Sequence, residues 1–293
     1  MKKAGYYLFD FFSRFLAILP KRGMYIFADF LFILAYYIIG YRKKVVYQNL
    51  RKSFPEKSQK EIKKIAKKFY RHLGDIIVEN MAILNMSVSK VQKFVKVRNV
   101  EVLNEMYDKD KSTIAITAHY GNWEFLPTLS SYTDYQILSV YKPLKNKFFD
   151  RKVFDMRRRF DGIPVPMKTV YKEIIRQKKT GTKFVMGLVS DQCPPRKYIN
   201  YWTEFLNQDT PFFTGAEKIA TKFNHAVVLI VVKKQKRGLY EIEFTPLVEH
   251  AKETSDTEIT EKYVRALEKA IRENPPYWLW SHRRWKYKKE DLN

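Results

Sequence analysis

A short apolar run that ends in a histidine constrains the fold of this chain most strongly. Residues Thr113–Ala118 are rich in β-branched side chains and carry no charge, so they predict a buried strand. Gly121 and Asn122 follow as turn residues, and Asn122 can cap the N-terminus of a helix. Glu124 would lie in the first turn of that helix, where the helix dipole favours a negative charge. His119 and Glu124 are therefore predicted to lie at the carboxyl end of a strand, where open α/β sheets place their sites.

The residue types at this strand end suit proton transfer. A neutral imidazole such as that of His119 accepts a proton from a hydroxyl near pH 7. A carboxylate on the other ring nitrogen, here Glu124, would fix the tautomer and stabilise the imidazolium. The stretch contains no serine or cysteine nucleophile, so the pair suits direct attack of a substrate hydroxyl on an activated acyl group. In the alternative, both residues are structural: His119 ends the strand and Glu124 interacts favourably with the helix dipole. The spacing alone favours this alternative.

The segment His119-Tyr-Gly-Asn-Trp-Glu124 resembles the His-x4-Glu/Asp motif of glycerolipid-type acyltransferases, in the version found in the late lipid A acyltransferases (the lauroyl/myristoyl transferase family). Further segments are similar to other motifs of this family and occur in the same order: Asn49-Leu-Arg-Lys-Ser-Phe-Pro-Glu56, Tyr141-Lys-Pro143, Arg157-Arg-Arg-Phe-Asp-Gly162, Asp191-Gln192, Pro211 with Thr214-Gly215, and Trp278 to Lys286. Together these segments span nearly the whole chain. Two positions differ from the family pattern: Lys142 stands where an arginine is common, and Asp161 interrupts the usual Arg-Phe-Gly.

This resemblance implies a glycerolipid acyltransferase-like fold and an acyl transfer activity. A fatty acyl chain would pass from an acyl-carrier thioester to a hydroxyl of a lipid A precursor or related saccharolipid. Acyl carrier protein is the expected donor, and coenzyme A is the alternative. His119 would act as general base and Glu124 would orient it, with no metal or other cofactor. The same chemistry on a glycerolipid, an amino-acid lipid or a mannoside is the alternative. The implied substrate-binding residues are Arg157, Arg158, Arg159, Asp191, Asn122 and Lys142.

The rest of residues 46–293 alternates strand and helix patterns, which predicts one α/β acyltransferase domain with a mixed sheet flanked by helices. The expected strands after the first are 136–141, 184–190, 226–232 and 239–245. The expected helices are 58–85, 148–160, 168–179, 214–223 and a last one that opens at 255 and stops at 274. Capping-box patterns mark two of the helix starts, Ser58-x-x-Glu61 and Ser255-x-x-Glu258. Asp191 follows the strand 184–190 and should therefore share the sheet edge of His119.

Residues 1–45 form a separate, membrane-associating helical segment in this reading. The run Met24–Tyr41 carries only one charge, but as a helix of eighteen residues it would be about 27 Å long, slightly short of a bilayer core. Basic residues flank it on both sides, so a single span would violate the positive-inside bias. We therefore expect a helical hairpin that turns at Pro20–Gly23, or two helices lying in the membrane interface. A buried helical hairpin of a soluble protein is the alternative.

The positive net charge of the chain indicates an anionic partner but does not say which kind. There are 55 basic and 31 acidic residues, a formal charge of +24, which attracts anionic membranes, acidic proteins, phosphate ligands or nucleic acid. Neither a Walker A loop nor a dinucleotide-binding fingerprint is present, which disfavours nucleotide chemistry. Cys193 is the only cysteine, which excludes an intramolecular disulfide. The resemblance implies the cytoplasmic face of the inner membrane and no nucleic-acid partner. A non-catalytic, membrane-tethered nucleic-acid-binding protein is the rival class.

Overall fold

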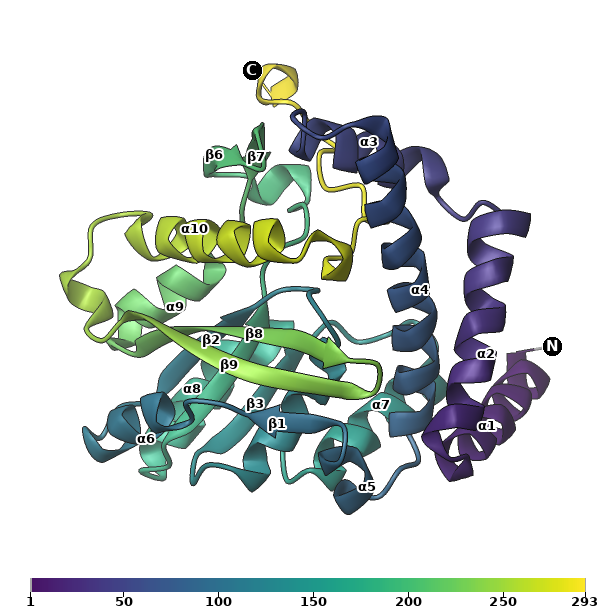
Figure 1. Cartoon of the computed structure of the whole chain (residues 1–293). Helices are drawn as coiled ribbons and strands as arrows, with labels where there is room; N and C mark the ends of the chain where they lie inside the picture. Colours follow the sequence, from purple (N-terminus) through teal and green to yellow (C-terminus); the bar gives the residue numbers. More distant parts are fainter. Residues whose placement is uncertain (1, 293) are drawn as a thin grey trace.

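Seven strands form one mixed sheet in the computed structural model, which describes residues 2–292 and the side chains of residues 5–290 (Figure 1). The strand order is β1-β9-β8-β2-β5-β3-β4, and β8–β9 is the antiparallel pair, so β9 and β1 run against the other five strands. The strands of this sheet are β1 Val95–Val97, β2 Thr113–Thr117, β3 Gln136–Tyr141, β4 Ile163–Pro166, β5 Phe184–Val189, β8 Ala226–Lys236 and β9 Leu239–Val248. A separate antiparallel ribbon pairs β6 Trp202–Phe205 with β7 Gln208–Pro211.

β2 lies at the centre of the sheet, between β8 and β5, and all five of its residues are buried. Strands covered on both faces read as continuous apolar runs rather than alternating ones, which is the pattern that predicted this strand. The α/β class and the mixed sheet are confirmed, as are the five expected strands within a few residues at their ends. The edge strands β1 and β4 were not predicted. Both are short, and β4 contains two prolines, which are tolerated at the edge of a sheet.

Ten α-helices among the described residues cover the two faces of the sheet and its end. Their bounds are α1 Lys2–Ile18, α2 Lys21–Ile33, α3 Lys43–Ser53, α4 Gln59–Ile83, α5 Val88–Gln92, α6 Glu101–Asp108, α7 Lys147–Arg159, α8 Val170–Lys179, α9 Gly215–Phe223 and α10 Glu258–Glu273. A π-helical turn, Leu34–Ile38, extends α2, and a 3₁₀ helix, Trp123–Ser131, follows the end of β2. In Figure 1, α10 crosses above the sheet while α4 stands along its end, with α2 and α1 outside α4.

Alternate residues of β2 feed two separate apolar cores, as the period of a strand requires. Ile114 and Ile116 pack in a core with the first half of α4, with α9 and with α10. Ala115 points the other way, into a core built with α1, α2, the last part of α4 and α7. The helices therefore clamp the central strand from both sides, and the residues that follow β2 start from a rigid platform.

The two predicted helix starts differ in outcome. At Ser58 the full capping box forms, since its side chain accepts from the Glu61 N–H and the Glu61 carboxylate accepts from the Ser58 N–H. At Ser255 the backbone N–H and hydroxyl also donate to the Glu258 carboxylate, both at 3.0 Å. However, α10 begins only at Glu258, because the preceding Thr257 has a positive φ of 68°. The second pattern therefore closes a turn before the helix rather than capping it.

The N-terminal helices pack on the body of the protein through α4. Gly74 of α4 allows a close approach to α2, because a Cβ there would lie 2.5 Å from the carbonyl oxygen of Ala28. Arg237, in the turn between β8 and β9, joins the two helices by pairing with Asp29 of α2 at 2.9 Å and Asp75 of α4 at 2.7 Å. No single helix among the described residues is long and apolar enough to cross a membrane. Residues Lys21–Ile38 and Lys43–Ser53, bent by 87°, pass that test of length and composition only as a pair.

Candidate active site

The parallel register of β2 and β5 brings His119 and Asp191 to the same level of the sheet. Thr117 pairs with Val189, and each of the two polar residues follows two positions later. The Ser190 N–H donates to the Thr117 carbonyl at 3.0 Å and extends this pairing beyond the strands. The expectation that Asp191 shares the sheet edge of His119 is confirmed.

Asp191 holds the histidine at two points. Its Oδ1 lies 2.7 Å from His119 Nδ1, and its Oδ2 accepts the backbone N–H of His119 at 3.1 Å. The indole N–H of Trp278 also donates to Oδ2, at 2.8 Å. Asp191 is 2% exposed, whereas the side chain of His119 is 19% exposed. A buried carboxylate therefore orients a partly exposed imidazole through Nδ1, the arrangement that fixes the tautomer of a general base.

The electrostatics of the pair follow from burial and mutual attraction. Burial acts to lower the pKa of His119, but the charge of Asp191, the hydrogen bond between them and the charge of Glu124 outweigh it and raise the pKa above its ordinary value. Burial likewise acts to raise the pKa of Asp191, but the attraction of His119 and the hydrogen bonds from His119 and Trp278 hold it below its ordinary value. Asp191 is thus the ionised acceptor, and His119 Nδ1 carries the proton.

The turn after His119 is fixed by a buried hydrogen-bond cluster. Gly121 has a φ of 61°, and a Cβ there would lie 1.7 Å from the carbonyl oxygen of Val232, so only glycine fits. Asn122 is fully buried: its side-chain oxygen accepts the Glu124 N–H at 3.3 Å and its amide donates to Glu79 Oε2 at 2.8 Å. The predicted cap is confirmed, and Asn122 serves here to hold the turn, while its expected substrate contact stays a prediction. No sequence pattern pointed to Glu79, which lies 43 residues earlier in α4.

Glu124 does not take the position predicted for it. Asp191, not Glu124, bonds His119 Nδ1. Glu124 lies in the first turn of the 3₁₀ helix, and its Oε2 is 3.7 Å from Nη2 of Arg157 in α7. The reason is that Asn122 starts a 3₁₀ turn, whose geometry turns the Glu124 side chain towards α7. The charge of Glu124 still contributes to raising the pKa of His119, after the larger effect of Asp191.

The three consecutive arginines point in different directions, as expected for neighbours on one helix. Arg157 approaches Glu124 and packs over the Tyr141 ring at 5.4 Å, while its buried Nη1 has no hydrogen-bond partner within the described part of the chain. Arg158 is exposed. Arg159 donates to the carbonyl groups of Leu84 and Met86 at the end of α4 and so caps that helix, while its expected role in substrate binding stays a prediction.

Lys142 lies one residue after β3, at the carboxyl end of the parallel part of the sheet, and its side chain is exposed. The lysine therefore shares the sheet edge of His119 and Asp191. Its place leaves the predicted substrate contact open.

Three further side chains surround the imidazole. The amide nitrogen of Gln192 lies 3.1 Å from His119 Nε2, and the Trp123 ring packs edge-on against the imidazole with centroids 4.7 Å apart. His282 accepts the backbone N–H of Cys193 at 3.2 Å, and burial lowers the pKa of His282 to about 4, so it is neutral. Neither Gln192 nor Trp123 was predicted as a site residue, although both lie inside the quoted motifs.

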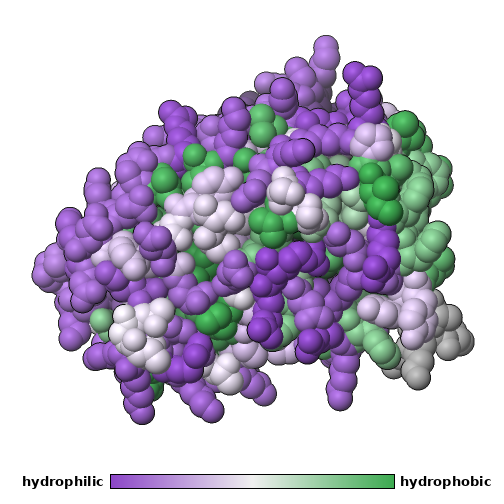
Figure 2. Space-filling view, turned by 90° about the horizontal axis from the view of Figure 1, so that it is seen from below, coloured by the Kyte–Doolittle hydropathy of each residue, from purple (hydrophilic) through white to green (hydrophobic). Residues whose placement is uncertain are grey.

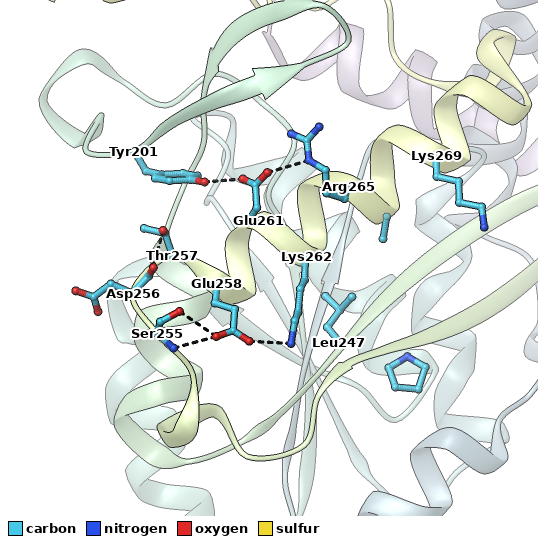
Figure 3. Close-up of a pocket in the computed structure, with 12 residues that line it drawn as sticks. Tyr201, Leu247, Ser255, Asp256, Thr257, Glu258, Glu261, Lys262, Arg265 and Lys269 are labelled. Carbon is cyan, nitrogen blue, oxygen red and sulfur yellow. Dashed lines mark hydrogen bonds and ion pairs between the residues drawn. The ribbon is translucent and has the colours of Figure 1, made fainter.

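An open cavity of about 770 Å³ lies elsewhere, along the first half of α10 (Figure 3). Its wall includes Pro246, which pairs with Val228 at the level of Ala115, the third residue of β2, whereas His119 lies two residues beyond the carboxyl end of that strand. Four of the charges that line it form ion pairs: Glu258 with Lys262 at 2.8 Å and Glu261 with Arg265 at 2.9 Å. This cavity therefore takes no part in the site at His119. Within residues 2–292, no three His, Cys, Asp or Glu side chains converge so as to hold a metal ion.

Comparison with known proteins adds the family. The sequence model of the bacterial lipid A biosynthesis acyltransferases matches residues 1–287. The chain belongs to this family. It is similar to the lipid A biosynthesis palmitoleoyltransferase of Escherichia coli (strain K12), with 22% identity over 247 residues that cover 84% of this chain and 79% of the relative, and equally to the lipid A biosynthesis acyltransferase of Shigella flexneri. The crystal structure of the 1-acyl-sn-glycerophosphate acyltransferase PlsC from Thermotoga maritima matches with a TM-score of 0.39 and 15% identity, covering 87% of this chain and 96% of that one.

Membership of the lipid A acyltransferase family confirms the resemblance drawn from the motifs and establishes an acyltransferase that acts on a lipid. In this member, motif segments from opposite ends of the chain meet around the site. Asn49 in α3 donates to the carbonyl groups of Trp280 and His282, both at 2.9 Å, and Trp278 forms a bridge with Tyr120. The C-terminal segment therefore packs beside the His119–Asp191 pair and helps to hold it in place.

Proposed function

We propose that this acyltransferase moves a fatty acyl chain from an acyl-carrier thioester to a hydroxyl of a lipid A precursor or a related saccharolipid. One observation carries the proposal: a partly exposed imidazole whose Nδ1 is bonded at 2.7 Å to a buried, ionised carboxylate. This pair needs no nucleophile of its own. It suits direct attack by an alcohol, which is the chemistry of O-acylation.

In the proposed reaction, His119 Nε2 takes the proton of the acceptor hydroxyl as its oxygen attacks the thioester carbon. The new C–O bond forms, the tetrahedral oxyanion collapses, and the C–S bond breaks. The imidazolium then returns the proton to the thiolate. Asp191 holds the imidazole and stabilises its positive charge between the two steps. The backbone N–H of Gly121 is bonded to the Tyr277 carbonyl at 2.9 Å and so does not serve as a donor to the oxyanion.

The charges beside His119 suit substrates that carry phosphate. Arg157 has a buried Nη1 with no protein partner in the described chain. It is connected to the site through its ion pair with Glu124. With the exposed Arg158 and Lys142 it provides cations at the sheet edge for acceptor phosphates or for the pantetheine phosphate of the donor. The overall charge of +24 also favours an acidic partner such as acyl carrier protein.

Purified enzyme offered a matched set of substrates tests this proposal. Acyl carrier protein and coenzyme A thioesters of the same chain would be supplied in turn, with either a phosphorylated lipid A precursor or a lysoglycerolipid as acceptor, and the products measured by mass spectrometry. We expect one added acyl group on the lipid A precursor and a higher rate from the carrier-protein donor. Acylation of the lysoglycerolipid alone would overturn the proposed acceptor and favour the glycerolipid alternative.

We also propose that α1 and α2 lie on the cytoplasmic face of the inner membrane. Figure 2 shows apolar side chains gathered on the flank that these two helices form. Along each helix the exposed apolar residues recur every three or four positions and so form one stripe. The stripes consist of Tyr7, Leu8, Phe11, Phe15 and Ile18 on α1, and Ile26, Phe30, Ile33 and Tyr37 on α2 and its π-helical extension. Two amphipathic helices with basic residues nearby suit binding parallel to the bilayer surface.

Polar substitution of this stripe is expected to release the enzyme from lipid. Replacing Ile26 and Phe30 by serine should weaken binding to vesicles of mixed neutral and anionic phospholipid by about two orders of magnitude, because burying each side chain contributes about 1.5–3 kcal/mol. Vesicle sedimentation measures the effect. The matched control replaces Tyr171 and Ile175, an exposed pair with the same spacing on α8, and should bind as the unmodified chain does. Equal loss in both variants, or in neither, would contradict the membrane role of the stripe.

A further inference from the structure

The nitrogen that must act as base is already occupied in this structure. His119 Nδ1 is held by Asp191, so Nε2 is the nitrogen left for the acceptor hydroxyl. The side-chain amide nitrogen of Gln192 lies 3.1 Å from that same Nε2. Gln192 follows Asp191 directly at the end of β5, so adjacent residues contact the two nitrogens of one imidazole. The proposed mechanism does not use this contact.

The direction of this hydrogen bond follows from the other side of the ring. Asp191 is ionised and accepts, so the proton of the neutral imidazole is on Nδ1 and Nε2 bears a lone pair. Only a donor can face that lone pair, and the amide nitrogen of Gln192 is a donor. Once Nε2 is protonated, the same nitrogen would oppose an N–H group and the contact would become unfavourable. Gln192 therefore complements the neutral, base-competent state of His119 and opposes the charged one.

We propose that Gln192 is a positioning residue that occupies the place of the acceptor hydroxyl in the free enzyme, favours the neutral form of His119 against the charges of Asp191 and Glu124, and is displaced when the acceptor binds. This inference rests on the proposed function, because the displaced position belongs to the hydroxyl that is acylated. Both Gln192 and His119 are partly exposed, so both side chains of this contact reach solvent, whereas Asp191 on the other side of the imidazole is 2% exposed.

The placeholder role predicts a shift in the titration of His119 that needs no substrate. Gln192→Met keeps the size of the side chain and removes the donor, so the charged imidazole is no longer opposed and the pKa of His119 should rise by about 0.5–1 unit. Gln192→Glu places a carboxylate at Nε2 and should raise it by more than one unit. The ionisable groups that already act on His119 are Asp191, Glu124 and His282, and none of them is changed in either variant.

Nuclear magnetic resonance of the full chain in detergent, with labelled histidine, measures this shift directly. The chain has five histidines, and the His119→Ala spectrum identifies the signal of interest. Gln59→Met and Gln59→Glu are matched controls, because Gln59 is exposed at the start of α4 and the same chemical changes there should leave the titration of His119 unmoved. An unchanged or lowered pKa in Gln192→Met would overturn the proposal, since the amide would then not be donating to Nε2.

Kinetics separate a placeholder from a structural or catalytic role. At a pH where His119 is neutral in both proteins, Gln192→Met should lower the KM for the acceptor by about fivefold, because no hydrogen bond has to be displaced, and leave kcat unchanged. A fall of kcat by 100-fold or more without a change in the titration would instead make Gln192 a contact of the transition state and sink the placeholder role. If neither protein acylates the lipid A precursor, the proposed acceptor fails, while the titration still decides the role of Gln192.

Discussion

Replacing His119 by alanine is expected to reduce acyl transfer by at least about 10³-fold, because a positioned general base contributes about 10²–10⁴-fold and no other group can take its place. Among the described residues of the site, His282 is another neutral histidine. It does not replace His119, because it already accepts the Cys193 N–H. The initial rate of product formation by mass spectrometry measures the loss. It would be compared with that of the unmodified chain at equal concentration and lipid content.

Stability must be measured on the same preparation, because His119 is also a partner of a buried charge. Its removal takes away the hydrogen bond from Nδ1 to Asp191 but leaves those from the His119 backbone N–H and from Trp278. We therefore expect a cost of about 1–3 kcal/mol and a folded protein. His119→Gln retains a polar donor of similar reach and separates the loss of folding from the loss of the base. A folded alanine variant that keeps a tenth of the normal rate would exclude the proposed mechanism.

Much of the fold could be predicted because its central strands are unbroken apolar runs. Residues 113–118 and 226–232 have no polar alternation and both were predicted as strands, the first of them as a buried one, and β2 and β8 are those strands. Their neighbours at the edges were missed for the opposite reason. β1 has three residues and β4 contains Pro164 and Pro166, and neither pattern differs from that of a loop. Tertiary pairing, rather than local preference, makes them strands.

The candidate site was predictable in its place but not in its pairing. The sequence indicated that His119 and Asp191 end parallel strands and so share an edge of the sheet. Only the register, with Thr117 opposite Val189, puts them within hydrogen-bond distance. Glu124 was chosen as the partner because it is near in sequence. The five residues after His119 do not show that Glu124 lies in a 3₁₀ helix. The partner of His119 is instead Asp191, 72 positions away in the sequence.

The two carboxylates near His119 are expected to differ sharply in their effect on the rate. Asp191→Asn should lower kcat/KM by about 10³–10⁴-fold, because an amide in place of the carboxylate no longer fixes the proton on Nδ1 or stabilises the imidazolium. Glu124→Gln should lower it by only about tenfold, since Glu124 contacts Arg157 at 3.7 Å and reaches His119 through its charge alone. Both substitutions conserve size and remove one charge, so each is the matched control of the other.

The pH dependence of the same two variants tests whether Asp191 and Glu124 raise the pKa of His119. Because Asp191 raises the pKa of His119 against the lowering effect of burial, Asp191→Asn should let that pKa fall, and the acid limb of the kcat/KM profile should move to lower pH. Glu124→Gln should move the limb in the same direction by a smaller amount, since the charge of Glu124 is the weakest of the effects that raise the pKa. Profiles of the remaining activity between pH 5 and 9 measure both shifts. A larger loss of rate and a larger shift in Glu124→Gln would return the orienting role to Glu124, which would then have to reach Nδ1 in the complex with substrates.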